Sequence, residues 1–154
     1  GLGDVYKRQE IDNKFQDLSF EISENINLRI VTTKDLDALH ILRHSSAHIL
    51  AQAVLNLYPN AQFGVGPSIE NGFYYDFLFE TPIKENELEN IEKEMKRIAK
   101  SAQSFIRSEI TKKDAIKIFK NQKLKLELIE SAESDEGVGE EIVSTYANDE
   151  FIDL

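Results

Sequence analysis

The stretch that decides the fold runs from Thr33 to Asn60 and reads TKDLDALHILRHSSAHILAQAVLNLYPN. Thr33 and Asp35 are residue types that commonly cap the start of a helix, and Pro59 would end one at about Tyr58. Apolar side chains cover most of the circumference between these signals, which is typical of a largely buried helix. The sequence therefore predicts one long central helix. A narrow polar stripe remains on it, formed by Ser45, Gln52 and Asn56.

All three histidines of the chain lie on this predicted helix, at His40, His44 and His48. Residues four apart stack on one helix face, so neighbouring imidazoles can converge on one ion or one substrate. A thermolysin-type zinc protease needs a glutamate directly after the first histidine of such a pair, where this chain has Ser45. Two histidines are also too few for a zinc site, which takes three or four protein ligands. Spacing alone leaves two interpretations open, hydrogen-bonded core histidines or part of a functional site, and it gives His40 no role.

The residues before the helix resemble the end of a small β-rich domain. Apolar residues alternate with polar ones around Leu18 to Ile22 and again around Ile26 to Ile30, which predicts two strands joined by a turn at residues 23–25. Two strands alone are marginally stable, so we expect a remnant of a larger unit. Gly1 to Gln9 shows neither strand nor helix periodicity, and we interpret it as a non-native leader outside the fold.

The residues after the helix alternate between hairpins and short helices. A glycine-punctuated hairpin is predicted from Gln62 to Phe79, with its turn between Gly66 and Gly72. The elements expected after it are a helix from Glu87 to about Ser104 capped by Asn86 and Glu89, a strand at 105–110, a helix from Thr111 to about 121, and strands at 124–129, 142–146 and 151–154. This mixture predicts an α+β fold in which a long histidine-bearing helix packs on antiparallel strands.

Composition narrows the class of protein further. The 154 residues are 41% hydrophobic and 30% charged, as in an ordinary globular domain, and no apolar run approaches a membrane span. We expect a cytoplasmic protein without a membrane partner. The chain has no cysteine, so any metal ligand of its own must be histidine or carboxylate. A net charge of −10 argues against binding nucleic acid over the whole surface; the lysine-rich stretch from Lys93 to Lys125 favours solvated helix faces over an RNA contact.

Two segments carry a resemblance to a known family. Leu42 to Leu50, LRHSSAHIL, resembles the opening of the editing domain that threonyl- and alanyl-tRNA synthetases share. Gly66 to Asp76, GPSIENGFYYD, is similar to the GPxIxxGFYYD signature of the threonyl branch and lies at the expected distance. Under this resemblance residues 10–33 are the end of a TGS domain, residues 34–154 are a truncated editing domain, and residues 1–9 stay outside both.

The resemblance also implies site residues. The family builds its editing site from the two helix histidines, a tyrosine of the GFYYD strand, a lysine on a later strand, an aspartate, and a Cys-x-x-x-His pair just after that aspartate. Motif matching therefore implies five catalytic residues, His44, His48, Tyr75, Lys125 and Asp153. It further implies a cysteine directly after Leu154 and a histidine four residues later. The site within these 154 residues is thus expected to be incomplete and inactive alone.

The implied activity is hydrolysis of mischarged Ser-tRNA(Thr). Serine lacks one methyl group of threonine, and such a difference gives only about 1–3 kcal/mol of discrimination in a binding pocket, so a second, hydrolytic site is needed. Histidines can hold the ribose and ester near neutral pH, a carboxylate and a lysine can act on the water and the oxyanion, and the tyrosine can form the pocket wall. The resemblance thus implies that His44 and His48 hold the ribose and the ester. Asp153 and Lys125 act on the water and the oxyanion, and Tyr75 forms the pocket wall.

Cofactors and partners follow from the same resemblance. We expect no cofactor and no metal in this segment, where His44 and His48 are the only metal candidates. ATP, magnesium and a zinc ion are implied for an aminoacylation core that these residues do not include. The implied partners are the aminoacylated 3′ end of tRNA, the remainder of the synthetase and a second copy of it. Two alternatives stay open: a freestanding editing hydrolase acting in trans, and a non-catalytic interaction module.

Overall fold

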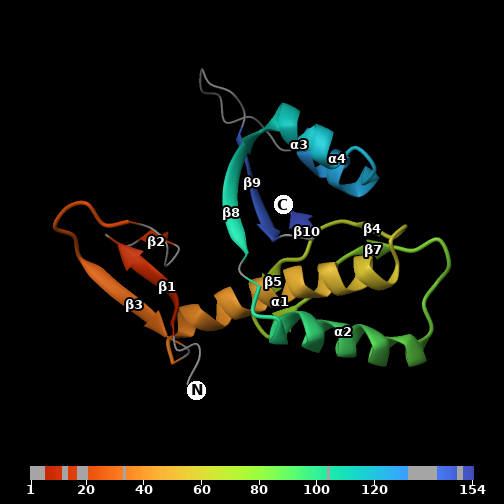
Figure 1. Cartoon of the computed structure of the whole chain (residues 1–154), viewed down its shortest axis with the longest axis horizontal. Coiled ribbons are helices and arrows are strands. Elements are labelled where there is room, and N and C mark those ends of the chain that lie inside the picture. The colour runs from red at the N-terminus through yellow and green to blue at the C-terminus, as the bar shows by residue number, and fades with distance from the viewer. Residues whose placement is uncertain are drawn as a thin grey trace.

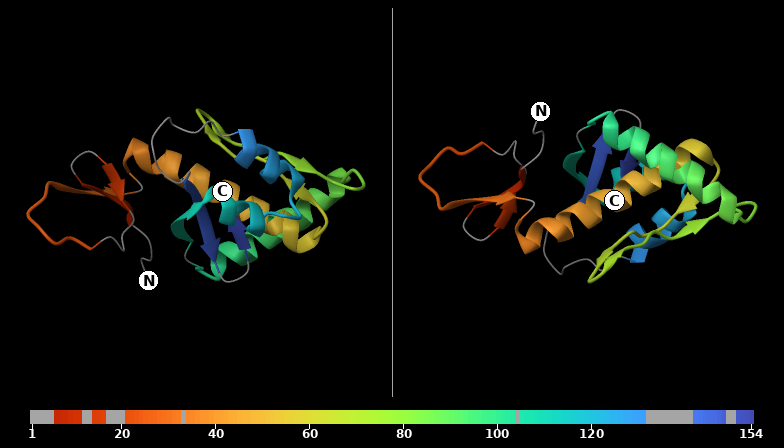
Figure 2. Two further views of the ribbon diagram at one scale, coloured as in Figure 1. Left: turned by 90° about the horizontal axis from the view of Figure 1, so that it is seen from above. Right: turned by 90° about the horizontal axis from the view of Figure 1, so that it is seen from below.

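The computed structural model describes residues 6–11, 14–16, 21–32, 34–103, 105–131, 142–148 and 151–154. A long helix, α1, runs through the middle of the molecule (Figure 1). A small sheet lies at its amino end, and the remaining helices and strands gather around the rest of it (Figures 1 and 2). Helices mix with small antiparallel sheets, so the predicted α+β class is confirmed. Among the described residues, no helix combines the length and apolarity that crossing a membrane requires.

Helix α1 spans Leu36–Leu57, as the sequence predicts. The Asp35 carboxylate accepts hydrogen bonds from the backbone N–H of Thr32 at 2.8 Å and from its hydroxyl at 2.9 Å, which fixes the chain just before the first turn. The prediction of burial holds mainly for the stretch from Ala47 to Val54, whereas Leu36 at the start is 90% exposed and Leu57 at the end 39%. Gln52, placed on the polar stripe by the sequence, is fully buried since it bonds inward to neighbouring amides.

The amino-terminal sheet has three antiparallel strands in the order β2-β1-β3. They are β1 (Tyr6–Ile11), β2 (Lys14–Gln16) and β3 (Leu28–Thr32). The prediction that Gly1 to Gln9 contains no strand is wrong for residues 6–9, because backbone pairing with β3 forms a strand without any apolar alternation. The predicted strand pair is also wrong in part: β3 is confirmed, but its partner is β1. Ile22 lies outside any strand, and Leu18 lies outside the described residues.

The glycine-rich hairpin forms two short ladders. Its base pairs β4 (Gln62–Phe63) with β7 (Phe77–Leu78), and its tip pairs β5 (Ser68–Ile69) with β6 (Gly72–Phe73). The hairpin prediction is confirmed. The tip is tied to α1, because the Arg43 guanidinium donates to the carbonyls of Ile69 at 3.1 Å and Glu70 at 2.5 Å. His40 and the Ser68 hydroxyl are also in hydrogen-bond contact, 2.8 Å apart.

Helix α2 (Leu88–Lys100) packs beside α1 and follows a short 3-10 turn, η1 (Glu85–Glu87). Its Ile91 and Ile98 pack with Ala53 and Val54 of α1 in one apolar cluster. The predicted cap at Asn86 and Glu89 is wrong. Instead the Glu87 carboxylate accepts the Lys84 backbone N–H at 2.7 Å and the Tyr58 hydroxyl at 3.0 Å, so the preceding turn closes first.

The described residues that follow α2 form a second sheet and two short helices. The sheet is antiparallel in the order β10-β9-β8, from β8 (Ile106–Thr111), β9 (Ile142–Asn148) and β10 (Phe151–Asp153), and all three strands are as predicted within a few residues. Helix α3 (Lys112–Ile118) is capped by the predicted Thr111, whose hydroxyl accepts the Asp114 N–H at 3.1 Å.

The predicted strand at 124–129 is wrong: these residues lie in helix α4 (Lys123–Ser131). The alternation of lysine with leucine imitates a strand, but leucine, lysine and glutamate are all strong helix formers. The helix buries Lys125 and Ile129, which are four residues apart and therefore share one face. Ile129 joins Ala51, Phe63, Phe119 and Phe151 in the main core, which fixes α1, the hairpin, α4 and β10 around one point.

Candidate functional site

Five residues from four separate segments meet at one pocket of about 440 Å³. His44 and His48 come from α1, Tyr75 from the hairpin between β6 and β7, Lys125 from α4 and Asp153 from β10. All five were predicted from the sequence, and the structure brings all five together. The remaining lining comes from the hairpin loop, α4 and the end of β10, with Val65, Gly66, Pro67, Leu128 and Leu154.

The Asp153 carboxylate is the centre of the site and is fully buried. One oxygen contacts His48 Nδ1 at 2.8 Å and accepts the Tyr75 hydroxyl at 2.6 Å. The other accepts Lys125 Nζ at 2.5 Å and the backbone N–H of Leu154 at 2.7 Å. Each oxygen therefore has two partners, which is close to the full capacity of a carboxylate.

A second contact extends this network along α1. His48 Nε2 lies 3.2 Å from His44 Nε2, so Asp153, His48 and His44 form a continuous hydrogen-bonded chain. His48 is 4% exposed, whereas His44 is only partly buried. The spacing of four residues brings the imidazoles together, as the sequence predicts, but their link to Asp153 depends on β10, which is 105 residues away.

Lys125 is placed differently from the sequence prediction. It lies on helix α4 rather than on a strand, and it reaches the site because its side chain is 2% exposed and points into the core. Its ammonium donates to the Tyr75 hydroxyl at 3.0 Å and lies 4.7 Å from the centre of the Phe63 ring. A buried ammonium is tolerated where a carboxylate and an aromatic face compensate its lost hydration.

Burial and charge shift the acidities of three of these groups. Burial raises the pKa of the Tyr75 hydroxyl, and the neighbouring Asp153 charge raises it further, so this phenol stays protonated. Burial lowers the pKa of Lys125, against the opposing effect of Asp153. Burial by itself would raise the pKa of Asp153, but the His48 hydrogen bond and the Lys125 charge outweigh it and hold the pKa below its usual value. Lys125 and Asp153 therefore form an ionised pair, and Tyr75 is neutral.

Two residues near the site, Tyr146 and Gln52, were given no site role by the sequence prediction. The Tyr146 ring on β9 packs against both imidazoles, with ring centres 4.8 Å from His48 and 5.4 Å from His44. Gln52 continues the histidine face one turn further and accepts a hydrogen bond from Asn148 at 3.0 Å. The four-residue spacing of His44, His48 and Gln52 could have revealed Gln52, whereas nothing local marks Tyr146.

The residues described do not form a metal site. No group of three or more His, Cys, Asp or Glu side chains within the described ranges has an arrangement that could hold a metal ion. The carboxylate that contacts His48, Asp153, is already bonded to Lys125 and Tyr75. The imidazoles, the ammonium, the phenol and the carboxylate are groups that can transfer protons or form hydrogen bonds to a polar molecule.

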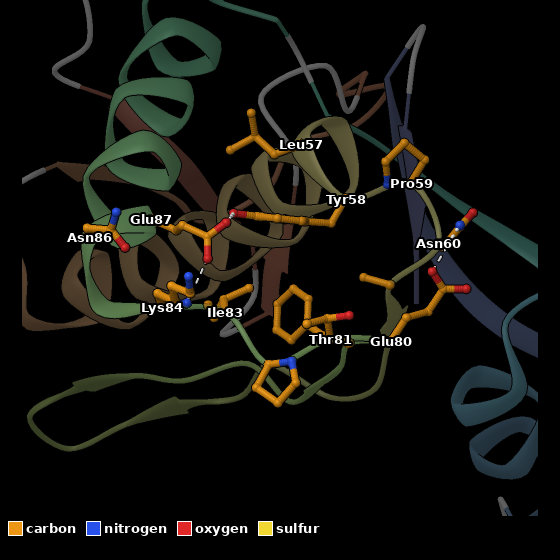
Figure 3. Close-up of a pocket in the computed structure, with 13 residues that line it drawn as sticks. Leu57, Tyr58, Pro59, Asn60, Glu80, Thr81, Ile83, Lys84, Asn86 and Glu87 are labelled. Atoms are coloured by element: carbon orange, nitrogen blue, oxygen red, sulfur yellow. Dashed lines mark hydrogen bonds between the residues drawn. The ribbon is translucent and has the colours of Figure 1, made fainter.

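A larger pocket of about 660 Å³ lies away from the histidines, between the end of α1 and the turn before α2. Figure 3 shows that its polar side chains bond to one another: Tyr58 to Glu87, and Asn60 to Glu80 at 3.2 Å. The carboxylates of Glu80 and Glu87 are therefore already hydrogen-bonded to neighbouring side chains of this pocket. We assign the functional site to the smaller pocket because that pocket gathers a buried carboxylate, a buried ammonium and two imidazoles.

Sequence comparison decides which family this geometry belongs with. Over 146 residues, 94% of its length, the chain is 47% identical to the threonine–tRNA ligase of Francisella philomiragia. It is 42% identical over its whole length to the threonine–tRNA ligase of Ralstonia nicotianae, and 44% identical over 94% of its length to that of Bordetella avium. The resemblance to threonyl-tRNA synthetases is confirmed.

The match covers only part of these threonyl-tRNA synthetases. The chain spans 22–24% of the length of the three relatives, while nearly all of the chain is matched. No protein-family model matches the chain. The similarity therefore concerns a segment of about a quarter of these threonyl-tRNA synthetases.

Proposed function

We propose that this chain forms most of an editing site that hydrolyses Ser-tRNA(Thr) within a threonyl-tRNA synthetase. The observation that carries the proposal is the network centred on Asp153, which joins His48, Tyr75 and Lys125 beside a pocket. Hydrolysis of an ester requires a group that takes a proton from water and groups that stabilise negative charge on the carbonyl oxygen. An imidazole can take the proton from water, and an ammonium can stabilise the negative charge on the carbonyl oxygen.

The geometry favours a supporting role for Asp153 over direct action on water. Both of its oxygens already have two partners, so a water molecule would have to displace one of them. A buried carboxylate bonded to imidazole Nδ1 orients that ring and stabilises its protonated form, as in Ser-His-Asp sites. We assign this function to Asp153 with respect to His48.

His48 and His44 then divide the proton-transfer work. When neutral His48 donates its Nδ1 proton to Asp153, its Nε2 is an acceptor, so the contact with His44 requires a proton on His44 Nε2. When His48 is protonated, its Nε2 donates to His44 instead. A proton can thus pass between the two rings, and His44, the less buried of them, is the one we assign to the ester or its attacking water.

Lys125 and Tyr75 complete the site from the opposite side. The ammonium balances the Asp153 charge with one of its three N–H donors and directs a second at the Tyr75 oxygen. Tyr75 accepts from Lys125 and donates to Asp153, so its ring is held as a wall of the pocket. We therefore assign charge balance and pocket shape to these two residues, with stabilisation of the oxyanion a further role for Lys125.

The experiment measures deacylation of Ser-tRNA(Thr) by a chimera in which this chain replaces the matching segment of the Francisella philomiragia enzyme. His48→Ala is expected to slow deacylation by about 10²-fold or more, the range that acid–base catalysis contributes, while threonylation is unchanged. His40→Ala is the matched control, because it removes a histidine of the same helix that contacts Ser68 outside the site. Unchanged deacylation by the His48 variant would sink the assignment.

The same chimera separates the alternatives. A freestanding hydrolase would deacylate as the isolated chain at the rate of the chimera. A non-catalytic module would leave Ser-tRNA(Thr) intact in both. In the setting we propose, the partners are the aminoacylated tRNA 3′ end and the remainder of a cytoplasmic synthetase, itself a homodimer, whose core would use ATP, magnesium and zinc to join threonine to tRNA.

A further inference from the structure

The hairpin that borders the pocket contains three glycines with very different surroundings. A Cβ built on Gly66 would lie 2.1 Å from Cδ2 of the Tyr75 ring and 2.9 Å from its Cγ. One on Gly64 would meet Asp76 Cβ at an ordinary 3.4 Å, and one on Gly72 would meet nothing within 4 Å. Of the three, only Gly66 occupies a place that a side chain could not share with a site residue.

Backbone conformation does not account for this glycine. Gly66 has no positive φ, so its backbone is one that other residues adopt. The following Pro67 favours an extended conformation for the residue before it, which alanine also accepts readily. The requirement at position 66 is therefore one of space, since the volume of a methyl group is already filled by the face of the Tyr75 ring.

The Tyr75 ring cannot easily move away from Gly66. Its hydroxyl bonds to Asp153 at 2.6 Å and to Lys125 at 3.0 Å, both of them buried. Its ring stacks on Phe77, with centres 5.0 Å apart, and lies 6.2 Å from the Phe63 ring. The contacts at Gly66 include Cγ of Tyr75 at 2.9 Å, and because Cγ lies on the axis about which the ring turns, rotation of the ring does not clear it.

The loop cannot easily retreat either. Backbone hydrogen bonds of 2.8 Å from the Gly64 N–H to the Asp76 carbonyl and of 3.0 Å from the Asp76 N–H to the Val65 carbonyl hold the two hairpin strands together just before Gly66. Beyond it, the tip is anchored to α1 through the Arg43 contacts with the carbonyls of Ile69 and Glu70. Ring and loop are thus both fixed.

We infer that Gly66 is a positioning residue of the site: its missing side chain lets the Tyr75 ring lie flat against the loop with its hydroxyl between Asp153 and Lys125. The effect on catalysis rests on the proposed function, whereas the effect on the position of Tyr75 does not. Gly66→Ala must push the ring out of the network, and Gly72→Ala, in the same hairpin, must not.

The first test follows the Tyr75 ring by NMR in the isolated chain carrying ¹³C-labelled tyrosine. The chain has five tyrosines, and the Tyr75 signal is identified by its loss in Tyr75→Phe. Gly66→Ala is expected to shift that signal toward the position of a solvent-exposed tyrosine, while Gly64→Ala and Gly72→Ala leave it in place. A Tyr75 signal that is unmoved in Gly66→Ala overturns the inference.

The second test remains decisive where Gly66→Ala folds poorly. Gly66→Ala is introduced into the Tyr75→Ala variant, which lacks the obstructing ring, and urea unfolding midpoints are compared. We expect Gly66→Ala to lower the midpoint clearly in the wild-type background and to leave it unchanged in the Tyr75→Ala background. An equal loss in both backgrounds would mean that the methyl group collides with something other than Tyr75, and it overturns the inference.

Deacylation by the chimera then separates the inference from the proposed function. A displaced Tyr75 with deacylation reduced by about 10²-fold, the cost of a misplacement near 1 Å, supports both. A displaced Tyr75 with unchanged deacylation supports the positioning role and contradicts the role of Tyr75 in the proposed site. An undisplaced Tyr75 rejects the positioning role whatever the rate.

Discussion

Replacing Lys125 by methionine tests the most unusual contact in the structure, a lysine buried against a buried aspartate. The side chains of Lys125 and Asp153 are 2% and 1% exposed, and they form an ion pair at 2.5 Å. Methionine keeps the length and the helix propensity of lysine but removes its charge. Asp153 would then keep its His48, Tyr75 and Leu154 contacts and lose its only lysine partner among the contacts that the structure describes.

The expected loss of stability is large for a single substitution. Removing one member of a buried ion pair costs about 3–5 kcal/mol, because the other charge remains buried without compensation. The three remaining contacts of Asp153 favour the lower end, about 3 kcal/mol. For a domain of this size each kcal/mol corresponds to roughly 2–4 °C, so we expect the melting temperature to fall by roughly 6–12 °C.

The assay is urea unfolding followed by far-UV circular dichroism and by tyrosine fluorescence, since the chain has no tryptophan. Lys123→Met is the matched control on the same helix, where the lysine is exposed, and it should change stability by less than about 0.5 kcal/mol. Combining Lys125→Met with Asp153→Asn should cost less than the two separate losses added together, because the second change removes the uncompensated charge.

Equal stability of the two lysine variants would contradict the buried ion pair. If Lys125→Met and Lys123→Met were equally stable, Lys125 would not be buried against Asp153. Helix α4 would then not deliver the Lys125 ammonium to Asp153, which is the role we give it in the site. Additive losses in the double variant would show that the lysine and the aspartate act independently.

Four further predictions concern the pH dependence of stability, the end of α2, the hairpin tip and metal content. The pKa of Asp153 is lowered, so its ionised form stabilises the fold above about pH 4 and this contribution is lost as the pH falls through the lower native value; the stability difference between wild type and Asp153→Asn should therefore shrink from pH 5 to pH 2 in urea titrations. Ala102 has a φ of 52° just after α2, so Ala102→Gly should raise stability by about 0.5–1 kcal/mol, whereas Ala99→Gly inside the helix should lower it by about 1 kcal/mol. Arg43→Met should speed amide hydrogen exchange in the hairpin tip without affecting α2, since it removes the bonds to two tip carbonyls. Elemental analysis of the purified chain should find far less than one equivalent of zinc, and a chelator should leave its melting temperature unchanged; stoichiometric zinc would contradict the assignment of the histidines to hydrogen bonding.

Much of the fold follows from local sequence signals. Asp35 and Pro59 bracket α1, Thr111 caps α3, and the glycines of the hairpin mark its turns, because each acts on backbone groups within a few residues. Local signals gave the wrong prediction where the alternation of apolar and polar residues and the helix propensity of the same residues disagree. Residues 124–129 alternate like a strand but are composed of helix formers, and packing of Lys125 and Ile129 on one face decided for the helix.

For the candidate site, the sequence by itself determined that His44 and His48 share one face of a helix, because helical periodicity alone brings residues four apart together. The family resemblance named Tyr75, Lys125 and Asp153 as their companions. Only the tertiary structure decided how these groups are joined. The contacts from Asp153 to His48 and Tyr75 cross 105 and 78 residues, and no local pattern encodes them. The same holds for Gly66, whose importance depends on a ring that the hairpin and the core bring against it.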